Sequence, residues 1–304
     1  MGLHIETPLL ESGALARPGR SVWLKMDALQ PSGSFKLRGI GHACAEYARR
    51  GARRFISSSG GNAGIAAAYA GRKLGLPVLV VVPETTSLRA RELIAREGAE
   101  IVVHGASFQE ANARAQAMLG ERDAFIHPFD DPLLWHGHAG MIDEVVRAGL
   151  APDAVVLSVG GGGLLCGVVE GLRRNGLSQV PVIAVETAGA DAYARSLGAG
   201  ERIELSAITS IATSLGARRV SERAFELAGE HPIRPVVVSD RAAVDACLRF
   251  MDDHRVVVEP ACGAALAVAY DDQGVLAGAS KVLVIVCGGV TATVEQLQRW
   301  GADL

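Results

Sequence analysis

One lysine of this chain stands where an amine could do chemistry. Lys36 ends a loop of small residues, 31–36, between a strand-like segment (residues 22–26) and a helix-like segment (residues 37–50) that stops at Gly51. Open α/β sheets bind ligands at such strand–loop–helix junctions. Partial desolvation near a helix N-terminus favours the neutral amine, which can form a Schiff base with a carbonyl compound. Taken alone, Lys36 fits an ordinary surface lysine better, but the rest of the sequence reverses that preference.

A run of four glycines at residues 160–163 indicates an anion site. It follows the strand-like residues 154–159 and opens a helix, so its backbone N–H groups can converge on an anion at a favourable helix end. No Gly-x-Gly-x-x-Gly spacing fits residues 160–171, and the Gly-Lys-Ser/Thr ending of a nucleotide P-loop is absent. The run predicts a site for one phosphate monoester, with a tight strand–helix turn as the alternative.

Two further strand ends carry polar groups. Residues 57–64 (SSSGGNAG) offer hydroxyls, amides and the carboxamide of Asn62, which suit a small substrate's carboxylate and a phenolic oxygen; a plain capped turn is the alternative. Cys287 and two glycines end the strand-like residues 282–286. Such a cysteine is usually a small buried hydrophobe, but this position favours a function.

Other polar residues are interpreted as structural. His136 and His138 are two residues apart, so on a helix they point to different faces, and no third metal ligand accompanies them. Asp130 and Asp131, next to Pro132, fit a turn better than a pair of catalytic acids.

Strand-like and helix-like segments alternate almost throughout the chain. Hydrophobic residues make up 49% of the 304 residues but aromatic ones only 5%, as expected for parallel sheets of Val, Ile, Leu and Ala buried on both faces. The alternation predicts a parallel α/β architecture. A break near residues 128–138 divides it into a small α/β unit, residues 40–135, and a larger unit formed by residues 1–39 and 136–304. The helix expected from residue 107 runs to about Glu121.

Composition also limits partners and location. The net charge is −3 and no long basic run occurs, so nucleic acid is not an expected partner. Apolar runs stay below the roughly 18 residues of a membrane span, and residues 1–8 show no signal-peptide pattern. The five cysteines are odd in number and form no Cys-x-x-Cys pair, which predicts reduced thiols and a cytoplasmic location.

An imine-forming lysine, a phosphate cradle and a carboxylate loop together describe a pyridoxal-phosphate site. The motifs that carry them resemble, in order and over nearly the whole chain, the L-serine dehydratase/L-threonine deaminase family, of the tryptophan-synthase β-like fold (fold type II). The similarity is greatest to its short, single-module serine dehydratases. The matching segments are residues 25–36, 58–64, 128–132, 158–166, 259–265 and 286–289.

The resemblance implies two open parallel-type α/β domains with the active site in the cleft between them. By this resemblance, Lys36 and Ser59 would be catalytic residues, and Lys36 would hold pyridoxal 5'-phosphate as an imine. Phe35 would pack on the pyridine face, Asn62 would bond the ring hydroxyl and Cys287 would face the ring nitrogen. The phosphate would lie on Gly160, Gly161, Gly162, Gly163 and Leu164, and the substrate carboxylate among Ser59, Gly60, Gly61 and Ala63.

The resemblance also implies a monovalent-cation (K⁺) site. At two positions, residues 60 and 214, this sequence departs from the family pattern. The cation would lie by Glu186 and the carbonyls around Gly160, Ala190, Leu215 and Ala217. Ser214 replaces an alanine that covers the other ring face in near relatives. Gly60 occupies a position that is alanine in some members and leaves more room beside the substrate.

The implied activity is β-elimination of L-serine to pyruvate and ammonia, and of L-threonine to 2-oxobutanoate, by a homodimer. No C-terminal regulatory extension is present, so control by isoleucine is not expected. On the same scaffold the alternatives are β-replacement, as in cysteine synthase or cystathionine β-synthase, and serine racemisation. A non-catalytic metabolite-binding protein is an alternative of another class, and the glycine spacing disfavours a nicotinamide-dependent oxidoreductase.

Overall fold

The computed structural model describes residues 2–271 and 274–304. Within them, the strands form a six-stranded sheet, ordered β1-β2-β10-β7-β8-β9, and a four-stranded sheet, ordered β5-β4-β3-β6. The larger sheet consists of β1 (Leu9–Glu11), β2 (Ser21–Lys25), β7 (Ala154–Ser158), β8 (Val182–Thr187), β9 (Ile233–Val238) and β10 (Lys281–Ile285). The smaller one consists of β3 (Arg54–Ser57), β4 (Val78–Val82), β5 (Glu100–Val103) and β6 (Asp123–Ile126).

The expected parallel α/β architecture is confirmed, with one departure. Strand β1 pairs antiparallel with β2 at the edge of the larger sheet, whereas the other strand pairings are parallel. Strands β7 and β8 are buried along their whole length, and only Lys281 of β10 is exposed. Their Val-, Ile- and Leu-rich sequences therefore fit strands that helices cover on both faces.

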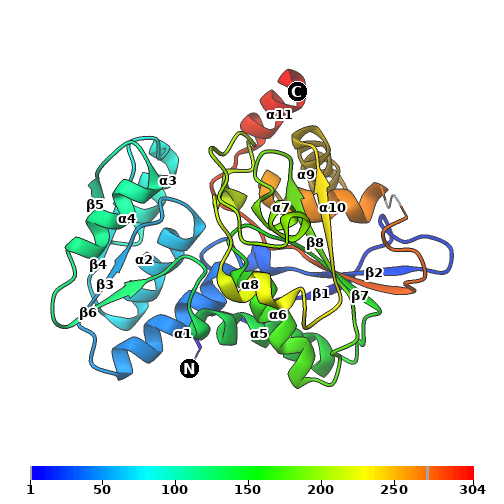
Figure 1. Cartoon of the computed structure of the whole chain (residues 1–304), viewed down its shortest axis with the longest axis horizontal. Helices are drawn as coiled ribbons and strands as arrows, with labels where there is room; N and C mark the ends of the chain where they lie inside the picture. The colour runs from blue at the N-terminus through cyan, green and yellow to red at the C-terminus, as the bar shows by residue number, and fades with distance from the viewer. Residues whose placement is uncertain (1, 272–273) are drawn as a thin grey trace.

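The helices around the larger sheet lie on the right in Figure 1. Helix α10 lies against β7 and β8, while α9 packs on α10 and α11 on α9. The helices here are α5 (Pro132–Arg147), α6 (Gly163–Arg174), α7 (Ala192–Ala199), α8 (Glu222–Leu227), α9 (Asp240–His254), α10 (Pro260–Asp271) and α11 (Val294–Asp303). None of the helices in the described residues is long and apolar enough to cross a membrane.

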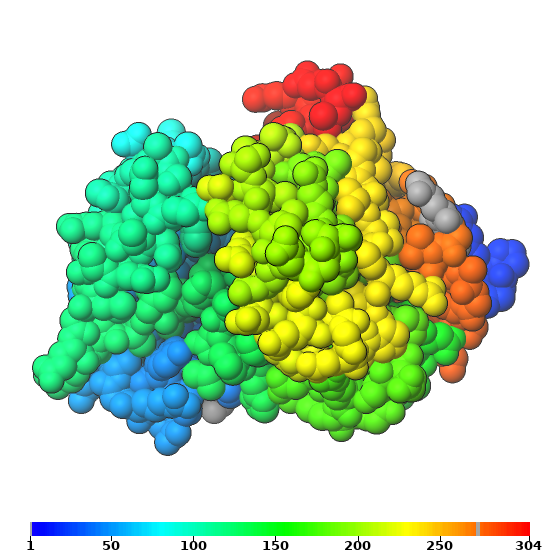
Figure 2. Space-filling view, viewed as in Figure 1, coloured from blue at the N-terminus to red at the C-terminus, as the bar shows by residue number. Residues whose placement is uncertain are grey.

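Helix α1 (Lys36–Arg49), whose first residue is the candidate lysine, lies between the two sheets (Figure 1). It packs on α5 of the larger part and on α2 of the smaller one, where the helices are α2 (Asn62–Leu74), α3 (Leu88–Arg96) and α4 (Phe108–Ala117). In the space-filling view of Figure 2, the smaller part on the left and the larger part on the right are in contact with each other. The domain limits at residues 39/40 and 135/136 stay a prediction. Helix α1 runs across the first of these limits without a break.

Glycines end several helices at the expected places. Gly51 and Gly75 follow α1 and α2 with φ of 101° and 68°, in the left-handed region that favours glycine. The expectation for α4 is wrong: the helix ends at Ala117 rather than near Glu121. There the Met118 carbonyl accepts a bond from Arg54, and the Gly120 N–H bonds the Asp123 side chain, so a turn replaces the last helical residues.

A buried ion cluster anchors α1. The Arg38 guanidinium, fully buried, pairs with Asp27 at 2.7 Å and with Glu144 of α5 at 2.7 Å. The Lys25 amine pairs with Glu144 at 2.5 Å and donates to the Thr7 carbonyl at 2.6 Å. Two cations and two carboxylates balance, which is what makes burial of these charges tolerable.

Candidate active site

The loop before Lys36 is paired with the chain that leaves β10. The Phe35 N–H donates to the Cys287 carbonyl at 3.0 Å, and the Gly289 N–H donates to the Gly33 carbonyl at 2.9 Å. Gly33 has φ of 78°, and a Cβ there would lie 2.5 Å from Val290. A glycine is therefore required for the loop to approach the β10 exit so closely.

Lys36 presents its amine to the segment before α5. Nζ donates to the Pro128 carbonyl at 2.6 Å. The side chain is partly exposed as a whole, but protein surrounds the amine, and this burial lowers the pKa of Lys36 to about 8 against the opposing effects of Cys287 and Glu259. The expectation of a desolvated amine is confirmed, and a pKa near 8 leaves a usable neutral fraction at physiological pH.

The glycine loop is backed by Phe129, the residue after Pro128. A Cβ on Gly161 would overlap the Phe129 ring, and one on Gly163 would lie 2.6 Å from the Phe129 carbonyl. Gly162, with φ of 96°, precedes the first residue of α6. Because Pro128 and Phe129 are adjacent, the Lys36 amine and the anion loop contact one short segment, so the structure brings the two together.

His127 stabilises that segment. Its Nδ1 accepts from the N–H groups of Phe129 at 3.3 Å and Asp130 at 2.8 Å. Burial and the nearby Lys36 lower the pKa of His127 to about 4, so the ring stays neutral with Nδ1 as an acceptor. No role for His127 was predicted from the sequence, because its backbone donors come together only in the folded turn.

The loop at residues 57–64 lies at the start of α2. Asn62 is the first residue of the helix, and the Ser59 hydroxyl accepts from the Gly61 N–H at 3.4 Å. Ala63 is buried, whereas a Cβ added to Gly61 would meet no atom within 4 Å. The amide N–H groups at this helix end can bind a carboxylate.

Asn62 is held by the carboxylate of Glu259, for which the sequence predicted no role. Its Nδ2 donates to Glu259 at 2.7 Å and lies 3.5 Å from the Ser214 hydroxyl, while Oδ1 accepts from the Val290 N–H at 3.4 Å. Burial raises the pKa of Glu259. Asn62, Ser214 and Glu259 are far apart in sequence, but they meet beside Lys36 and Cys287.

Cys287 lies at the strand end, as expected, and is buried. A hydrogen bond with Cys262 and burial raise the pKa of Cys287 well above that of an ordinary thiol. Near neutral pH it is therefore an uncharged thiol, able to donate a hydrogen bond but not to hold a negative charge.

The residues proposed for a cation have partners of their own. Glu186 accepts from the N–H groups of Tyr193 at 2.9 Å and Ala194 at 2.7 Å, at the start of α7, and burial raises its pKa to about 8. The Leu215 carbonyl accepts from the Ala217 N–H at 2.8 Å. In the described residues, no cluster of three His, Cys, Asp or Glu side chains is arranged for a metal ion. The cation site stays a prediction.

The interpretation of His136, His138, Asp130 and Asp131 as structural stays a prediction. His136 is exposed and pairs with Glu170 at 2.9 Å, whereas His138 is fully buried with its ring centroid 4.9 Å from that of Phe35. Asp131 accepts from the Leu133 N–H at 2.8 Å and caps α5. The contact between the His138 ring and the Phe35 ring was not predicted from the sequence.

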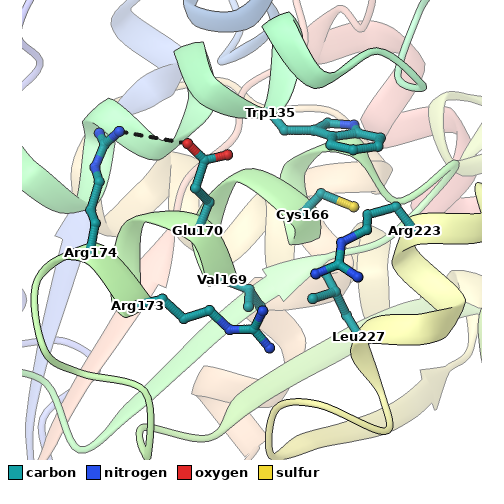
Figure 3. A pocket seen from close by; sticks show the side chains of 8 residues that line it. All are labelled: Trp135, Cys166, Val169, Glu170, Arg173, Arg174, Arg223 and Leu227. Carbon is teal, nitrogen blue, oxygen red and sulfur yellow. Dashed lines mark ion pairs between the residues drawn. The ribbon is translucent and has the colours of Figure 1, made fainter.

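A cavity of about 440 Å³ is lined by residues of α5, α6 and α8 (Figure 3). Trp135, Cys166, Val169 and Leu227 supply apolar surface, and Arg173, Arg174 and Arg223 supply cationic groups. These cations already pair within the protein: Arg173 and Arg223 with Glu230, and Arg174 with Asp143. The cavity touches the site only indirectly, since Trp135 donates to the Phe129 carbonyl at 2.9 Å.

The residues present fit pyridoxal phosphate. The glycine loop has no side chains and begins a helix, as a phosphate needs. Lys36 offers a partly desolvated amine, Asn62 has a second N–H with only a long contact, and Cys287 is an uncharged thiol facing the same region. The groups that the cofactor requires at its phosphate, its aldehyde and its ring are thus gathered together.

Comparisons with known proteins agree with this geometry. The chain is 50% identical over 308 residues to the "Serine dehydratase-like" protein of Mus musculus, covering 97% of this chain and 93% of that protein. It is 46% identical over 308 residues to the "L-serine dehydratase/L-threonine deaminase" of Homo sapiens, covering 97% and 94%. The structure of a fungal L-serine ammonia-lyase from Rhizomucor miehei matches with a TM-score of 0.93 and 35% identity, covering 100% of this chain and 99% of that one. The family model described as "Pyridoxal-phosphate dependent enzyme" matches residues 1–288. The chain therefore belongs to the family of pyridoxal-phosphate-dependent enzymes.

Proposed function

We propose that this protein is an L-serine dehydratase that converts L-serine to pyruvate and ammonia and also acts on L-threonine. The observation that carries the proposal is the Lys36 amine, with a pKa lowered to about 8, bonded to Pro128 next to the residue that backs the glycine loop. The names of the relatives, at 46% and 50% identity over nearly the whole chain, support the same activity.

Each group of the site has a task in this reaction. Lys36 would hold the cofactor through its amine and, once that amine is free, would remove the α-proton of the substrate as a general base. The cofactor supplies an electron sink for the pair left at the α-carbon. The glycine loop binds the phosphate, and the amides around Ser59, Gly60 and Gly61 orient the substrate carboxylate. The Pro128 carbonyl accepts an N–H of the free lysine and keeps it close to the reacting carbon.

Cys287 favours elimination over competing reactions. Its neutral thiol would donate a hydrogen bond to the ring nitrogen but could not durably protonate it, as a carboxyl partner would, so the cofactor would be a weaker electron sink. A weaker electron sink would favour rapid loss of the β-hydroxyl over reactions that need a long-lived charge at the α-carbon. The same scaffold also supports β-replacement and racemisation, so the assay must separate the three reactions.

The test is release of pyruvate and ammonia from L-serine by the holoenzyme without any thiol. We expect equal amounts of the two products from the wild type. Lys36→Ala should lose the absorbance of the lysine-bound cofactor and at least about a thousandfold in rate. Lys73→Ala, at an exposed lysine of α2, is the matched control and should behave as wild type.

Three other outcomes would redirect the proposal. Activity retained in Lys36→Ala would refute the role of the lysine. Turnover only in the presence of a thiol would indicate β-replacement, and D-serine without pyruvate would indicate racemisation. A wild-type protein without cofactor absorbance would favour a non-catalytic metabolite-binding protein. A panel of β-hydroxy amino acids, assayed with and without potassium, ranks serine against threonine and tests the cation site.

We further propose a cytoplasmic homodimer with a K⁺ site at Glu186. The five free and buried cysteines support a reducing compartment, and the dimer rests on the family resemblance. Light scattering after size-exclusion chromatography tests the dimer. A KCl-dependent rise in the thermal midpoint that Glu186→Gln removes tests the cation site.

A further inference from the structure

Glu259 is a buried carboxylate in the centre of the site that the reaction scheme leaves unused. It is 5% exposed and comes directly before α10. Its carboxylate lies against Gly289, which has φ of 121° and where any side chain would overlap it. No Lys, Arg or His among the described residues forms an ion pair with it. A buried carboxylate is costly without compensating bonds, so its hydrogen bonds indicate its purpose.

Those bonds come from side chains far apart in the sequence, of which Asn62 is the one expected to contact the cofactor's phenolic oxygen. Asn62 Nδ2 donates to Glu259 at 2.7 Å, and the Thr291 hydroxyl donates at 3.0 Å. The nearby Ser214 hydroxyl also opposes the rise in the pKa of Glu259 that burial causes. Both carboxylate oxygens accept a hydrogen bond here, so the Asn62 side chain turns its NH₂ group, and not its oxygen, towards Glu259.

The orientation of Asn62 is therefore set mainly by Glu259, with a longer contact on the other side. Oδ1 accepts the backbone N–H of Val290 at 3.4 Å, and the first N–H of Nδ2 belongs to Glu259. The second N–H has only the Ser214 hydroxyl at 3.5 Å, which is too long for a strong bond. One well-oriented donor is thus left for a ligand.

We propose that Glu259 is a positioning residue that holds Asn62 so that its free N–H meets the phenolic oxygen of pyridoxal phosphate. Without an obligatory acceptor at residue 259, the carboxamide can rotate by half a turn. Its oxygen would then face the phenolic oxygen, and two acceptors would repel each other. The proposal rests on the cofactor of the family and not on the identity of the substrate.

A double-mutant cycle tests the proposal on the intact protein. The readouts are the dissociation constant of pyridoxal phosphate and the wavelength of the lysine-bound cofactor band, both measured without substrate. We expect Glu259→Gln, which can present either oxygen or NH₂ to Asn62, to weaken binding about tenfold and to shift the band. Asn62→Ala should weaken it by a similar factor. In the Asn62→Ala background, Glu259→Gln should change binding less than twofold, because the partner through which it acts is gone.

Two matched variants complete the design. Thr291→Val removes another bond of Glu259 without touching Asn62 and should change binding less than twofold. Glu259→Asp keeps the carboxylate and should recover most of the loss. Glu259→Ala, which also removes the acceptor, replaces the glutamine variant if that one fails to fold by circular dichroism. Additive losses in the double mutant, an unchanged Glu259→Gln, or an equal loss in Thr291→Val would each overturn the proposal. A protein that binds cofactor normally but releases no pyruvate would refute the proposed activity and leave this test readable.

Discussion

The two glycine-rich loops of this protein share one local design but differ in what packs on them. Residues 57–61 and 158–162 each connect a parallel strand to a helix, β3 to α2 and β7 to α6. In the second loop, side chains on Gly161 and Gly162 would overlap Phe129 and Ala224. In the first loop, Gly61 has free space within 4 Å, and Gly60 meets only the side chain of Thr86.

This difference separates a closed site from an open one. The loop before α6 offers backbone N–H groups alone and is enclosed by fixed neighbours, as suits a phosphate that stays bound through many turnovers. The loop before α2 adds the Ser59 hydroxyl and the Asn62 carboxamide and is open on one side. It suits a carboxylate that enters and leaves in each turnover. Sequence alone gives the same signal for both loops, and the packing distinguishes them.

The largest expected effect comes from filling the closed loop. In Gly163→Ala the new methyl would lie 2.6 Å from the Phe129 carbonyl and 3.0 Å from its Cα, both backbone atoms that cannot move aside cheaply. We expect a loss of pyridoxal-phosphate affinity of about 3 kcal/mol, or roughly a hundredfold, in absorbance titrations of the apoprotein. Gly61→Ala is the control and should stay within twofold. Equal losses in both variants would remove the contrast between the loops.

The second-largest effect is expected for Lys36, whose amine bonds Pro128, the neighbour of the Phe129 that packs on the closed loop. Burial lowers the pKa of Lys36 to about 8, and only the neutral amine bonds the cofactor. The rate at which apoprotein gains the lysine-bound absorbance should rise about tenfold per pH unit below pH 8 and level off above it. Stopped-flow absorbance from pH 6 to 9.5 measures this. A rate still rising steeply at pH 9.5 would show that the amine is not desolvated in solution.

The smallest effect is expected in the open loop before α2. In Gly60→Ala the methyl would lie 2.5 Å from Thr86 Oγ1, but Thr86 is a loop side chain that can rotate away. Given the proposed activity, we expect kcat/KM for L-threonine to fall about tenfold and that for L-serine less, since threonine carries an extra methyl. Cofactor affinity should not change. Adding Thr86→Ala should restore most of the threonine activity, and a failure to do so would mean that Thr86 is not the obstacle.

Local signals predicted much of the fold. Val- and Leu-rich runs identified β2, β7 and β10, and Gly51 marked the end of α1. Strand β1 was missed because three residues at a sheet edge give no periodicity. Helix α4 was predicted too long because the competing bond from Arg54 to Met118 joins residues 64 positions apart.

The candidate site divides in the same way. Lys36, Asn62, Cys287 and the glycine loop follow strand ends, so the rule for open α/β sheets locates them. Phe129 and Glu259 lie in segments that match the family. Their roles, however, depend on contacts with residues far away in the sequence: Phe129 with Gly161 and Gly163, and Glu259 with Asn62. No spacing along the chain predicts such contacts, because the residues are linked through the packing of α1, α5 and β10.

The ion cluster beneath α1 has a practical consequence for anyone preparing this protein. The Thr7 hydroxyl donates to Asp27 at 2.7 Å and its carbonyl accepts from Lys25, while Gln30 bonds both backbone groups of Ile5, at 3.0 and 2.8 Å. The first turns of the chain are thus built into the support of the reactive lysine, whereas Leu304 is exposed beyond α11 at the periphery (Figure 1). Affinity tags and fluorescent fusions are better joined after Leu304 than ahead of Ile5.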